Sequence, residues 1–273
     1  MRELQAHIIQ DMGVRPSIDP AEEVRLRVDF LCDYLKASRA NGFVLGISGG
    51  IDSSLAGRLC QLAVDKLSEE GTDADFVAVR LPYRAQADEE DAQSALEFIQ
   101  PKTSRTFDVE PGTTGIEREF RRATGRDIAD FNKGNVKARM RMIAQYALAG
   151  EKNLLVVGTD HAAESITGFF TKFGDGGVDV LPLYGLDKRQ NRELLKYLGA
   201  DERVWAKVPT ADLLDSTPGR TDEDELGITY DVIDDFLEGK DIETDQAEAL
   251  EARYLRTRHK RTTPVTILDQ WWK

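Results

Sequence analysis

The sequence predicts an α/β protein with a doubly wound, mainly parallel sheet and helices on both of its faces. Three observations support this fold class. Short apolar runs with the length of buried strands alternate with helical segments through the first half of the chain. A Gly/Ser-rich turn joins one of these runs directly to a helix. After residue 200 the alternation ends in a Pro/Gly-rich stretch and two further helical segments, so we expect residues 1–273 to form a single domain with a helical C-terminal tail.

The first helix and the first strand illustrate the two patterns. A helix is predicted over 19–40 because Asp19-Pro20 is a favourable cap and first-turn pair, and apolar side chains then recur every three or four residues. A strand is predicted over 42–47, which is short and mostly apolar. By the same criteria the later elements are, in chain order, helix 52–67, strand 76–81, helix 88–99, strand 105–109, helices 116–130 and 134–149, strand 153–158, and helices 187–199, 229–238 and 244–258.

The composition limits the classes of partner. Hydrophobic residues make up 41% and charged residues 31% of the chain, which is typical of a soluble globular protein. The formal net charge is −13, whereas nucleic-acid binding requires concentrated Lys and Arg, so we expect no nucleic-acid partner. The apolar runs are too short to cross a bilayer and the polar N-terminus does not resemble a signal peptide. We therefore expect no membrane association and a cytoplasmic location, with Cys32 and Cys60 reduced and buried.

The residues with the clearest chemistry lie in the turn Ser48-Gly49-Gly50-Ile51-Asp52-Ser53-Ser54 between the first strand and the second helix. Glycines without Cβ atoms allow the backbone to approach a ligand, and the amides at a helix N-terminus favour anions. The serine hydroxyls add donors, and Asp52 is a hard oxygen ligand for Mg²⁺. The structural alternative is a capped Gly-rich turn that binds nothing. Because all these features coincide after a predicted strand, we interpret residues 46–54 as a loop that binds a diphosphate, although the lysine of a Walker loop is absent.

The pattern Ser-Gly-Gly-x-Asp-Ser resembles the diphosphate loop of the ATP pyrophosphatases, whose fold is the adenine nucleotide alpha hydrolase-like α/β fold. Six further segments resemble one branch of this superfamily, the ammonia-dependent NAD synthetases, over nearly the whole length of the chain and in the same order. They begin at Gly134, Gly158, Thr171, Pro209, Asp222 and Arg258 and read GNVKARMRM, GTDHAAE, TKFGDGGVD, PTADL, DEDELGITY and RHKR. The loop departs from the family at Ile51, where glutamine is common, and we expect this side chain to face away from the phosphates.

The resemblance implies a ligase that uses ATP and Mg²⁺ to amidate deamido-NAD⁺ with ammonia, through an NAD-adenylate, to NAD⁺, AMP and diphosphate, the last step of NAD biosynthesis. It also implies a homodimer that binds the dinucleotide across its interface. Carried over position by position, ATP would contact Gly46, Ile47, Ser48, Gly49, Gly50, Ile51, Asp52, Ser53, Ser54, Thr159, Lys188 and Thr210; deamido-NAD⁺ would contact Arg139, Lys172, Asp179, His259 and Lys260; Mg²⁺ would bind Asp52 and Glu164; and Asp175 and Lys188 would be catalytic.

Several of these residues also have a purely structural interpretation. Thr159-Asp160 could cap a helix, and Glu164 and Lys188 could be solvated charges. His259 could cap the carbonyls of the helix 244–258. Asp175 lies in a glycine-rich turn that needs no function; by resemblance it could hold ammonium and accept its proton.

Other segments leave alternatives open. The stretch 208–227 is either a flexible connection or a lid that orders over the nucleotides. We expect its acidic run 222–225 to cap the next helix or to meet a partner subunit, without a catalytic role. The pair Trp271-Trp272 either anchors a dimer or frays. Core or interface positions are expected for Met140, Met142, Phe169 and Phe170.

Two other functional classes are compatible with the diphosphate loop by itself. A tRNA-thiolating ATP pyrophosphatase would carry catalytic cysteines and a basic face, and the sequence indicates neither. A non-catalytic nucleotide sensor would not need both candidate Mg²⁺ carboxylates together with the dinucleotide contacts. We therefore favour the synthetase interpretation.

Overall fold

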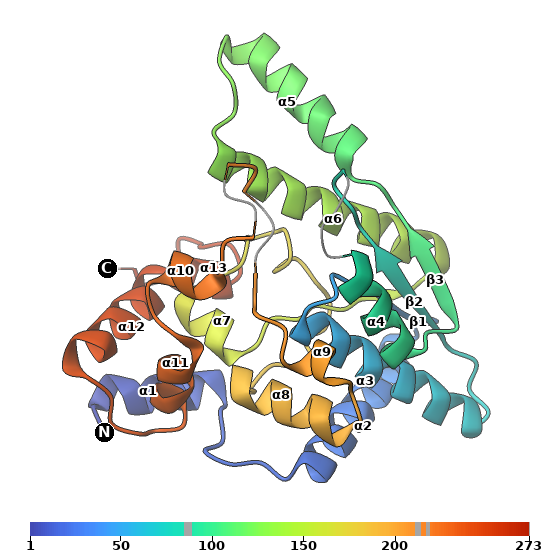
Figure 1. The fold of residues 1–273 in the computed structure, drawn as a ribbon, viewed down its shortest axis with the longest axis horizontal. Helices are drawn as coiled ribbons and strands as arrows, with labels where there is room; N and C mark the ends of the chain where they lie inside the picture. The colour runs from blue at the N-terminus through green and yellow to red at the C-terminus, as the bar shows by residue number, and fades with distance from the viewer. Residues whose placement is uncertain (85–88, 211–213, 217–218, 273) are drawn as a thin grey trace.

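The computed structural model describes residues 1–84, 89–210, 214–216 and 219–272, which are built around a parallel sheet. The sheet in this part of the chain has four strands in the spatial order β3-β2-β1-β4, and every pairing is parallel (Figure 1). The predicted doubly wound α/β fold is therefore confirmed. The strands are β1 (Gly42–Gly46), β2 (Asp75–Arg80), β3 (Thr103–Thr106) and β4 (Leu155–Val156).

Helices connect the strands and continue after the sheet. Helix α2 is capped as predicted, because the Asp19 carboxylate accepts a hydrogen bond of 2.9 Å from the Glu22 amide. The helices in the described residues are α1 (Glu3–Met12), α2 (Pro20–Ser38), α3 (Ile51–Glu69), α4 (Glu89–Ile99), α5 (Glu110–Thr124), α6 (Asp130–Lys152), α7 (Ala162–Thr167), α8 (Lys188–Tyr197), α9 (Glu202–Trp205), α10 (Asp222–Leu226), α11 (Tyr230–Leu237), α12 (Thr244–Arg256) and α13 (Arg258–Arg261).

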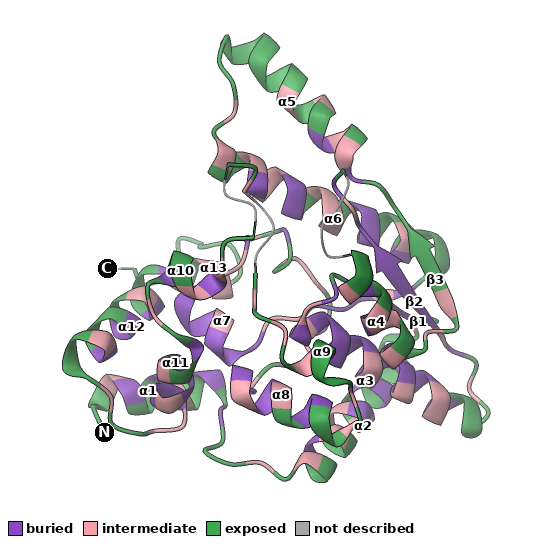
Figure 2. Cartoon of the chain, viewed as in Figure 1, coloured by how far each residue is buried: buried purple, intermediate pink, exposed green. Residues whose placement is uncertain are grey.

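Successive residues of β1 and β2 face two different hydrophobic cores, which explains why these two strands are mostly apolar. Phe43 and Phe76 point into one core beneath α2, α3 and α8. Val44 and Val77 point into the opposite core beneath α6. Buried residues accordingly follow the strands and the inner faces of these helices (Figure 2). Cys32 and Cys60 are free and buried, as predicted.

Several elements after β2 differ from the predicted boundaries. The third strand lies at Thr103–Thr106 rather than 105–109, because this segment pairs with β2 in that register. The helix expected over 116–130 begins at Glu110, where Pro111 fits the first turn, and ends before Gly125. Gly125 has a φ of 70° and closes the last turn in the left-handed conformation. The strand expected over 153–158 is shorter, and Val157 continues it only as a bridge to Val180.

The two ends of the chain meet in a third core. Helix α1, for which the sequence analysis predicted no element, buries Ile8 and Met12 against α11 and α12. The Gln5 side chain donates to the Phe236 carbonyl at 3.0 Å, and Arg2 pairs with Glu251 at 2.8 Å. These partners are distant in sequence, so local periodicity does not reveal this helix.

Within the described residues, no helix combines the length and the apolar composition that crossing a membrane requires.

Candidate active site

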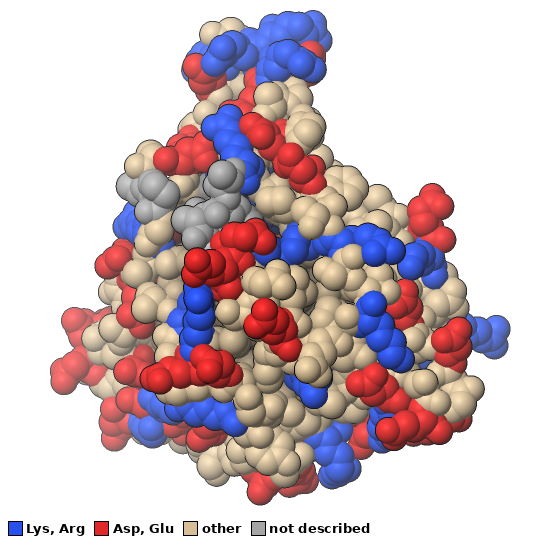
Figure 3. Space-filling view, turned by 45° about the vertical axis from the view of Figure 1, so that its right-hand side comes forward, with Lys and Arg blue, Asp and Glu red and all other residues tan. Residues whose placement is uncertain are grey.

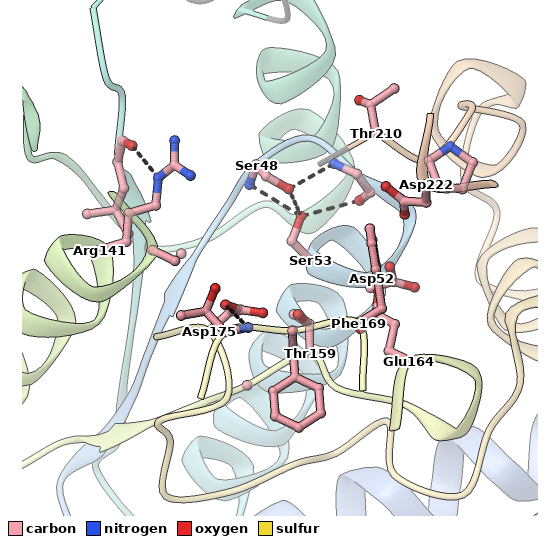
Figure 4. Close-up of a pocket in the computed structure, with 18 of the residues that line it drawn as sticks. Ser48, Asp52, Ser53, Arg141, Thr159, Glu164, Phe169, Asp175, Thr210 and Asp222 are labelled. Atoms are coloured by element: carbon pink, nitrogen blue, oxygen red, sulfur yellow. Dashed lines mark hydrogen bonds between the residues drawn. The ribbon is translucent and has the colours of Figure 1, made fainter. Parts of the chain in front are cut away.

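A cavity of about 480 Å³ opens at the carboxyl ends of β1 and β4, where open α/β sheets bind ligands. Its wall is built from segments that are far apart in sequence: the loop after β1, one side of α6, the loop after β4, the start of α8, and the chain before α10. Figure 4 shows polar side chains from these segments converging on one space. The fold therefore provides a single site with several chemically different walls.

The loop after β1 is a tight turn shaped by a glycine and by serine hydrogen bonds. Gly49 has a φ of 82°, and a Cβ added there would lie 2.6 Å from the Ala92 amide nitrogen of α4. The Ser48 hydroxyl accepts from the Gly50 amide at 3.2 Å and lies 3.1 Å from the Ser53 hydroxyl. The first residues of α3 line the cavity, where the amides of a helix start attract anions.

Beside this loop, two carboxylates, a lysine and a histidine converge. Lys188 Nζ lies 2.7 Å from Asp52 Oδ2 and 3.9 Å from Glu164 Oε1. His161 Nε2 lies 3.5 Å from an oxygen of each of these acids, and Asn191 donates to Asp52 at 2.9 Å. Only 1% of Lys188 is exposed, so its interpretation as a solvated charge is wrong.

Mutual pairing keeps these buried groups charged. Burial opposes ionisation of Asp52, but the positive charges of Lys188 and His161 outweigh it and hold the pKa of Asp52 below its ordinary value. In the same way Asp52 and Glu164 overcome burial and raise the pKa of Lys188. The two acids also raise the pKa of His161. The group is therefore a compact set of compensating charges.

The same residues fit a divalent cation. One ligand atom each from Asp52, His161 and Glu164 lie within 4.8 Å of one another. Carboxylate oxygens are preferred ligands of Mg²⁺, which usually adds water and phosphate oxygens. The predicted pair Asp52 and Glu164 is thus brought together. The sequence analysis gave His161 no role, although its i, i+3 spacing from Glu164 was a usable signal.

Asp222 is a cavity residue that sequence reasoning missed. It is buried, accepts from the Tyr230 hydroxyl at 3.1 Å, and has a pKa that burial raises to about 6. The cap of α10 is Thr221 rather than the acidic run, because its hydroxyl accepts from the Asp224 amide. The next helix, α11, has Thr229 as its N-cap, and Glu223 adds one hydrogen bond there by accepting from the Tyr230 amide at 2.8 Å. The acidic run therefore contacts the start of this helix without supplying its N-cap, and Asp222 lines the cavity.

The glycine-rich segment after Lys172 forms the tight turn that the sequence predicts, with Phe173 at a φ of 59°. Asp175 in this turn accepts from the Thr171 amide at 3.0 Å. Its carboxylate is exposed to the cavity, but the surrounding protein buries it enough to raise its pKa to about 6. Lys260 lies nearby in the wall and donates to the carbonyls of Gly168 and Phe170.

The cavity brings together most of the residues assigned to ATP. Ser54 is an exception, since it is fully buried and its hydroxyl donates to the Gly50 carbonyl at 2.7 Å. Gly49 shapes the loop without lining the cavity. After Thr210, the rest of the segment 209–213 lies outside the described residues. The predicted residues that line the cavity are Gly46, Ile47, Ser48, Gly50, Ile51, Asp52, Ser53, Thr159, Glu164, Asp175, Lys188, Thr210 and Lys260.

The other residues assigned to the dinucleotide lie beside the cavity. Arg139 donates to the Lys172 carbonyl at 3.3 Å, and Lys172 Nζ donates to the His259 carbonyl at 2.5 Å. Asp179 accepts from the Tyr146 hydroxyl at 2.9 Å and from the Val156 amide at 2.8 Å. This group therefore forms a surface next to the cavity and does not enter it.

Two structural expectations are wrong. The first helix after β4 is capped at His161 and not at Thr159-Asp160, and Asp160 instead accepts from Ser165. His259 lies in α13, so it does not cap α12, which ends at Arg256. Met142, Phe169 and Phe170 line the cavity, and Phe169 and Met140 also pack against the core, as expected.

Comparison with known proteins agrees with this geometry. The NAD synthase family matches residues 23–264. The NH(3)-dependent NAD(+) synthetase of Leifsonia xyli subsp. xyli is 61% identical over 272 residues, which is 100% of this chain and 98% of that protein. The crystal structure of NAD+ synthetase from Burkholderia pseudomallei has 50% identity and a TM-score of 0.82, over 95% of this chain and 96% of that one.

A further solved structure is similar along the same length. NMN synthetase from Francisella tularensis has 36% identity and a TM-score of 0.80, over 93% of this chain and 100% of that one. The family match, the identity to the synthetases and the arrangement of the cavity lead to the same conclusion: the chain belongs to the NAD synthase family.

Proposed function

We propose that this protein is an ammonia-dependent NAD⁺ synthetase, which amidates deamido-NAD⁺ with ammonia while ATP is cleaved to AMP and diphosphate. The observation that carries the proposal is the convergence of the diphosphate loop, Asp52, Glu164 and Lys188 on one cavity. The relatives that match the whole chain are named for this reaction.

In the first step, the nicotinate carboxylate of deamido-NAD⁺ attacks the α-phosphorus of ATP and diphosphate leaves. The amides and hydroxyls of residues 48–53 hold the departing diphosphate at the start of α3. Lys188 lies close enough to exchange its contact with Asp52 for one with a phosphate oxygen. Mg²⁺ bound by Asp52 and Glu164 would supply further positive charge to the phosphate oxygens.

In the second step, ammonia attacks the acyl carbon of the NAD-adenylate, and the bond to the AMP oxygen breaks. The Asp175 carboxylate can hold ammonium at the cavity wall and take its proton, which leaves neutral ammonia as the nucleophile. Lys260 provides a cation on the same wall, where AMP or the dinucleotide phosphates are negative. No side-chain nucleophile is required in either step.

A homodimer is part of this proposal. Helix α5 projects from the body of the molecule (Figure 1), and α5 and α6 expose the apolar residues Ile116, Phe120, Phe131 and Ile143. Positive side chains gather at the projecting end (Figure 3), which complements a chain of net charge −13. Arg139, Ile143 and Tyr146 follow each other at helical spacing on α6, so the dinucleotide contacts adjoin this apolar face.

The remaining functional classes receive less support. A tRNA thiolase needs reactive cysteines, whereas Cys32 and Cys60 are buried within α2 and α3 and burial raises the pKa of both thiols. Reduced cysteines agree with a cytoplasmic location, which we include in the proposal. A non-catalytic sensor would not need the Asp175 carboxylate in the wall of the cavity.

The test is to incubate the purified protein with deamido-NAD⁺, ATP, Mg²⁺ and ammonium and to quantify AMP and NAD⁺. We expect equal amounts of the two products. Omission of ammonium or of Mg²⁺ should stop NAD⁺ formation. If no NAD⁺ forms under any of these conditions, the proposed function is wrong.

A second candidate is amidation of the mononucleotide, as the name of the similar Francisella tularensis protein suggests. The two substrates share the nicotinate half that would enter the cavity. They differ in the adenylate half, for which the surface of Arg139 and Lys172 would be needed. A comparison of kcat/KM for the two substrates decides between them, and Arg139→Met should lower kcat/KM only for the dinucleotide.

A further inference from the structure

Helix α11 holds the backbone of Lys188, the buried lysine of the cavity wall. Asp234 of α11 accepts from the Lys188 amide at 3.1 Å and from the Arg189 amide at 2.9 Å. Tyr230 lies four residues before Asp234, so these two side chains project from the same face of the helix. The face that fixes the backbone of Lys188 therefore also carries an aromatic ring.

This ring contacts the ammonium group of the same lysine. Lys188 Nζ lies 4.7 Å from the centroid of the Tyr230 ring, inside the range of about 6 Å for a cation–π interaction. Each of the two residues is only 1% exposed, so water does not weaken the attraction. Asp52 and Glu164 line the cavity, whereas Tyr230 is not among the lining residues. The ring therefore meets the ammonium group from behind the cavity wall.

Hydrogen bonds and packing fix the position of the ring. The Tyr230 hydroxyl donates to Asp222 at 3.1 Å, and its amide donates to Glu223 at 2.8 Å. The ring is also part of the third core, which joins α1 to the C-terminal helices. Turning the ring away from Lys188 would break the bond to Asp222 and open this core.

The ring and the acid have different consequences for the lysine. The Asp52 carboxylate pairs with the ammonium group, and in the proposed first step a phosphate oxygen takes its place. An aromatic ring has no net charge and attracts a cation through its quadrupole, so it does not compete with the phosphate for an ion pair. The contact with Tyr230 can therefore persist while the charged partner of Lys188 changes.

We propose that Tyr230 is a positioning residue for the reaction, because its ring holds the Lys188 ammonium group ready for the phosphates of ATP. This inference rests on the proposed function. A charged group that is fixed before the reaction stabilises the developing charge without a cost of reorganisation. Lys188 acts in the first step, in which diphosphate leaves. Loss of the ring should therefore slow formation of the adenylate and leave the response to ammonia unchanged.

The test measures diphosphate release in a single turnover with deamido-NAD⁺, ATP and Mg²⁺, without ammonium, so that only the first step is observed. Tyr230→Leu removes the ring and should slow this release about 30-fold, which corresponds to a desolvated cation–π interaction. Tyr230→Phe keeps the ring and should remain within about fivefold of the wild type, since it loses only the hydrogen bond to Asp222. The KM for ammonium in the complete reaction should be the same in all three proteins.

A fluorinated series tests the charge of the ring while its shape is nearly unchanged. Phenylalanine with one, two or three ring fluorines at position 230 has progressively less negative charge on the ring face, so diphosphate release should slow with each added fluorine. A role of the ring in packing alone predicts no such dependence. The series decides between these roles even if Tyr230→Leu does not fold.

The matched control is Phe236→Leu, because Phe236 is a buried aromatic residue of the same helix and the same core. Its diphosphate release should match the wild type, and thermal melting of each variant measures the damage to the core. A release rate that does not depend on the number of fluorines overturns the inference while the proposed function stands. An equal slowing in Phe236→Leu and Tyr230→Leu does the same. Absence of diphosphate release from the wild type overturns both.

Discussion

Single residues in the cavity owe their properties to the groups that enclose them. Asp52 and Lys188 are 136 positions apart in sequence, yet each stabilises the charge of the other at the wall of the cavity. Asp175 and Asp222 have no such partner at bonding distance among the described residues, and burial raises the pKa of each to about 6. The cavity thus contains acids of two kinds, those paired with cations and those poised to take a proton.

Asp175→Asn tests the role of the acids that have no cationic partner. The variant cannot take a proton from ammonium, so NAD⁺ formation should fall about 10²-fold, while the Kd of deamido-NAD⁺ changes little. In the wild type, the required form is the carboxylate, whose pKa is about 6, so the rate should decline as the pH falls through about 6. This decline should be absent from the residual activity of the variant. Unchanged turnover would remove the assigned role.

Glu164→Gln tests the role of the acids that are paired with cations. Loss of one carboxylate weakens a Mg²⁺ site in which Asp52 is the other acid, so the Mg²⁺ concentration for half-maximal rate should rise about tenfold or more. Excess Mg²⁺ should restore much of the rate. Glu225→Gln is the matched control, since Glu225 lines the same cavity without belonging to the group that could hold the metal. An identical Mg²⁺ dependence in the two variants contradicts the assignment.

At the level of secondary structure, helix termini position the site. The N-terminus of α8 presents Lys188 and is held by two acids: Asp187 accepts from the Gln190 amide at 2.7 Å, and Asp234 accepts from the amides of Lys188 and Arg189 at 3.1 and 2.9 Å. Burial and the charge of Asp234 raise the pKa of Asp187, and burial raises that of Asp234. The helix start is therefore fixed by an acid pair that resists full ionisation.

We expect Asp187→Asn to stabilise the protein at high pH, because it removes one of these two neighbouring buried acids. The pKa of the pair is raised in the folded state, so the folded state binds more protons than the unfolded chain, and stability decreases as the pH rises through the raised pKa. Asparagine keeps an acceptor for the Gln190 amide and removes one charge. The free energy of unfolding of the variant should exceed that of the wild type by on the order of 1 kcal/mol at about pH 8 and by little at about pH 5. Urea unfolding at the two pH values measures this difference in the free energy of unfolding. An equal difference at both pH values would contradict the explanation.

The turn that leads into α3 depends on one backbone conformation. Gly49→Ala places a Cβ 2.6 Å from the Ala92 amide at a φ of 82°, so either the loop or α4 must move. We expect about 1–3 kcal/mol of destabilisation and a Kd for ATP that rises about tenfold or more. Gly150→Ala is the control, because its Cβ would meet no atom within 4 Å in α6. Equal effects of the two substitutions would show that the loop has no special geometry.

For the whole molecule, the exposed apolar face of α5 and α6 is the feature that the single chain leaves unexplained. Ile143→Asp adds a charge to the centre of this face, which is already exposed in one chain. We expect a folded protein that elutes as a monomer in size-exclusion chromatography with light scattering, and whose KM for deamido-NAD⁺ is raised at least about tenfold.

The control for this prediction lies on the other side of the sheet. Leu26 on α2 is similarly exposed, so Leu26→Asp should change neither the assembly state nor the KM. A wild-type monomer, or an Ile143→Asp dimer of normal activity, would disprove the proposed interface.

Local sequence was sufficient to predict the elements that are formed by residues close together in the chain. The Asp19 cap, the periodic helices and the strand–turn–helix of residues 42–67 are all present, because neighbouring residues supply their hydrogen bonds and apolar faces. The family resemblance placed Asp52, Glu164 and Lys188 in one site. It did not indicate that Lys188 is fully buried between two acids.

The sequence by itself determined the fold class, the strand–turn–helix around Ser48 and the family, since these depend on local periodicity and on motifs that can be read in order. Only the tertiary structure decided which polar residues share a space. It brought His161 to Asp52 and Glu164, added Asp222 to the cavity wall, formed α1 against the C-terminal helices, and brought Asp215 to the lysines of α6. The physical reason is that burial and charge pairing depend on distances in space between residues that are far apart along the chain.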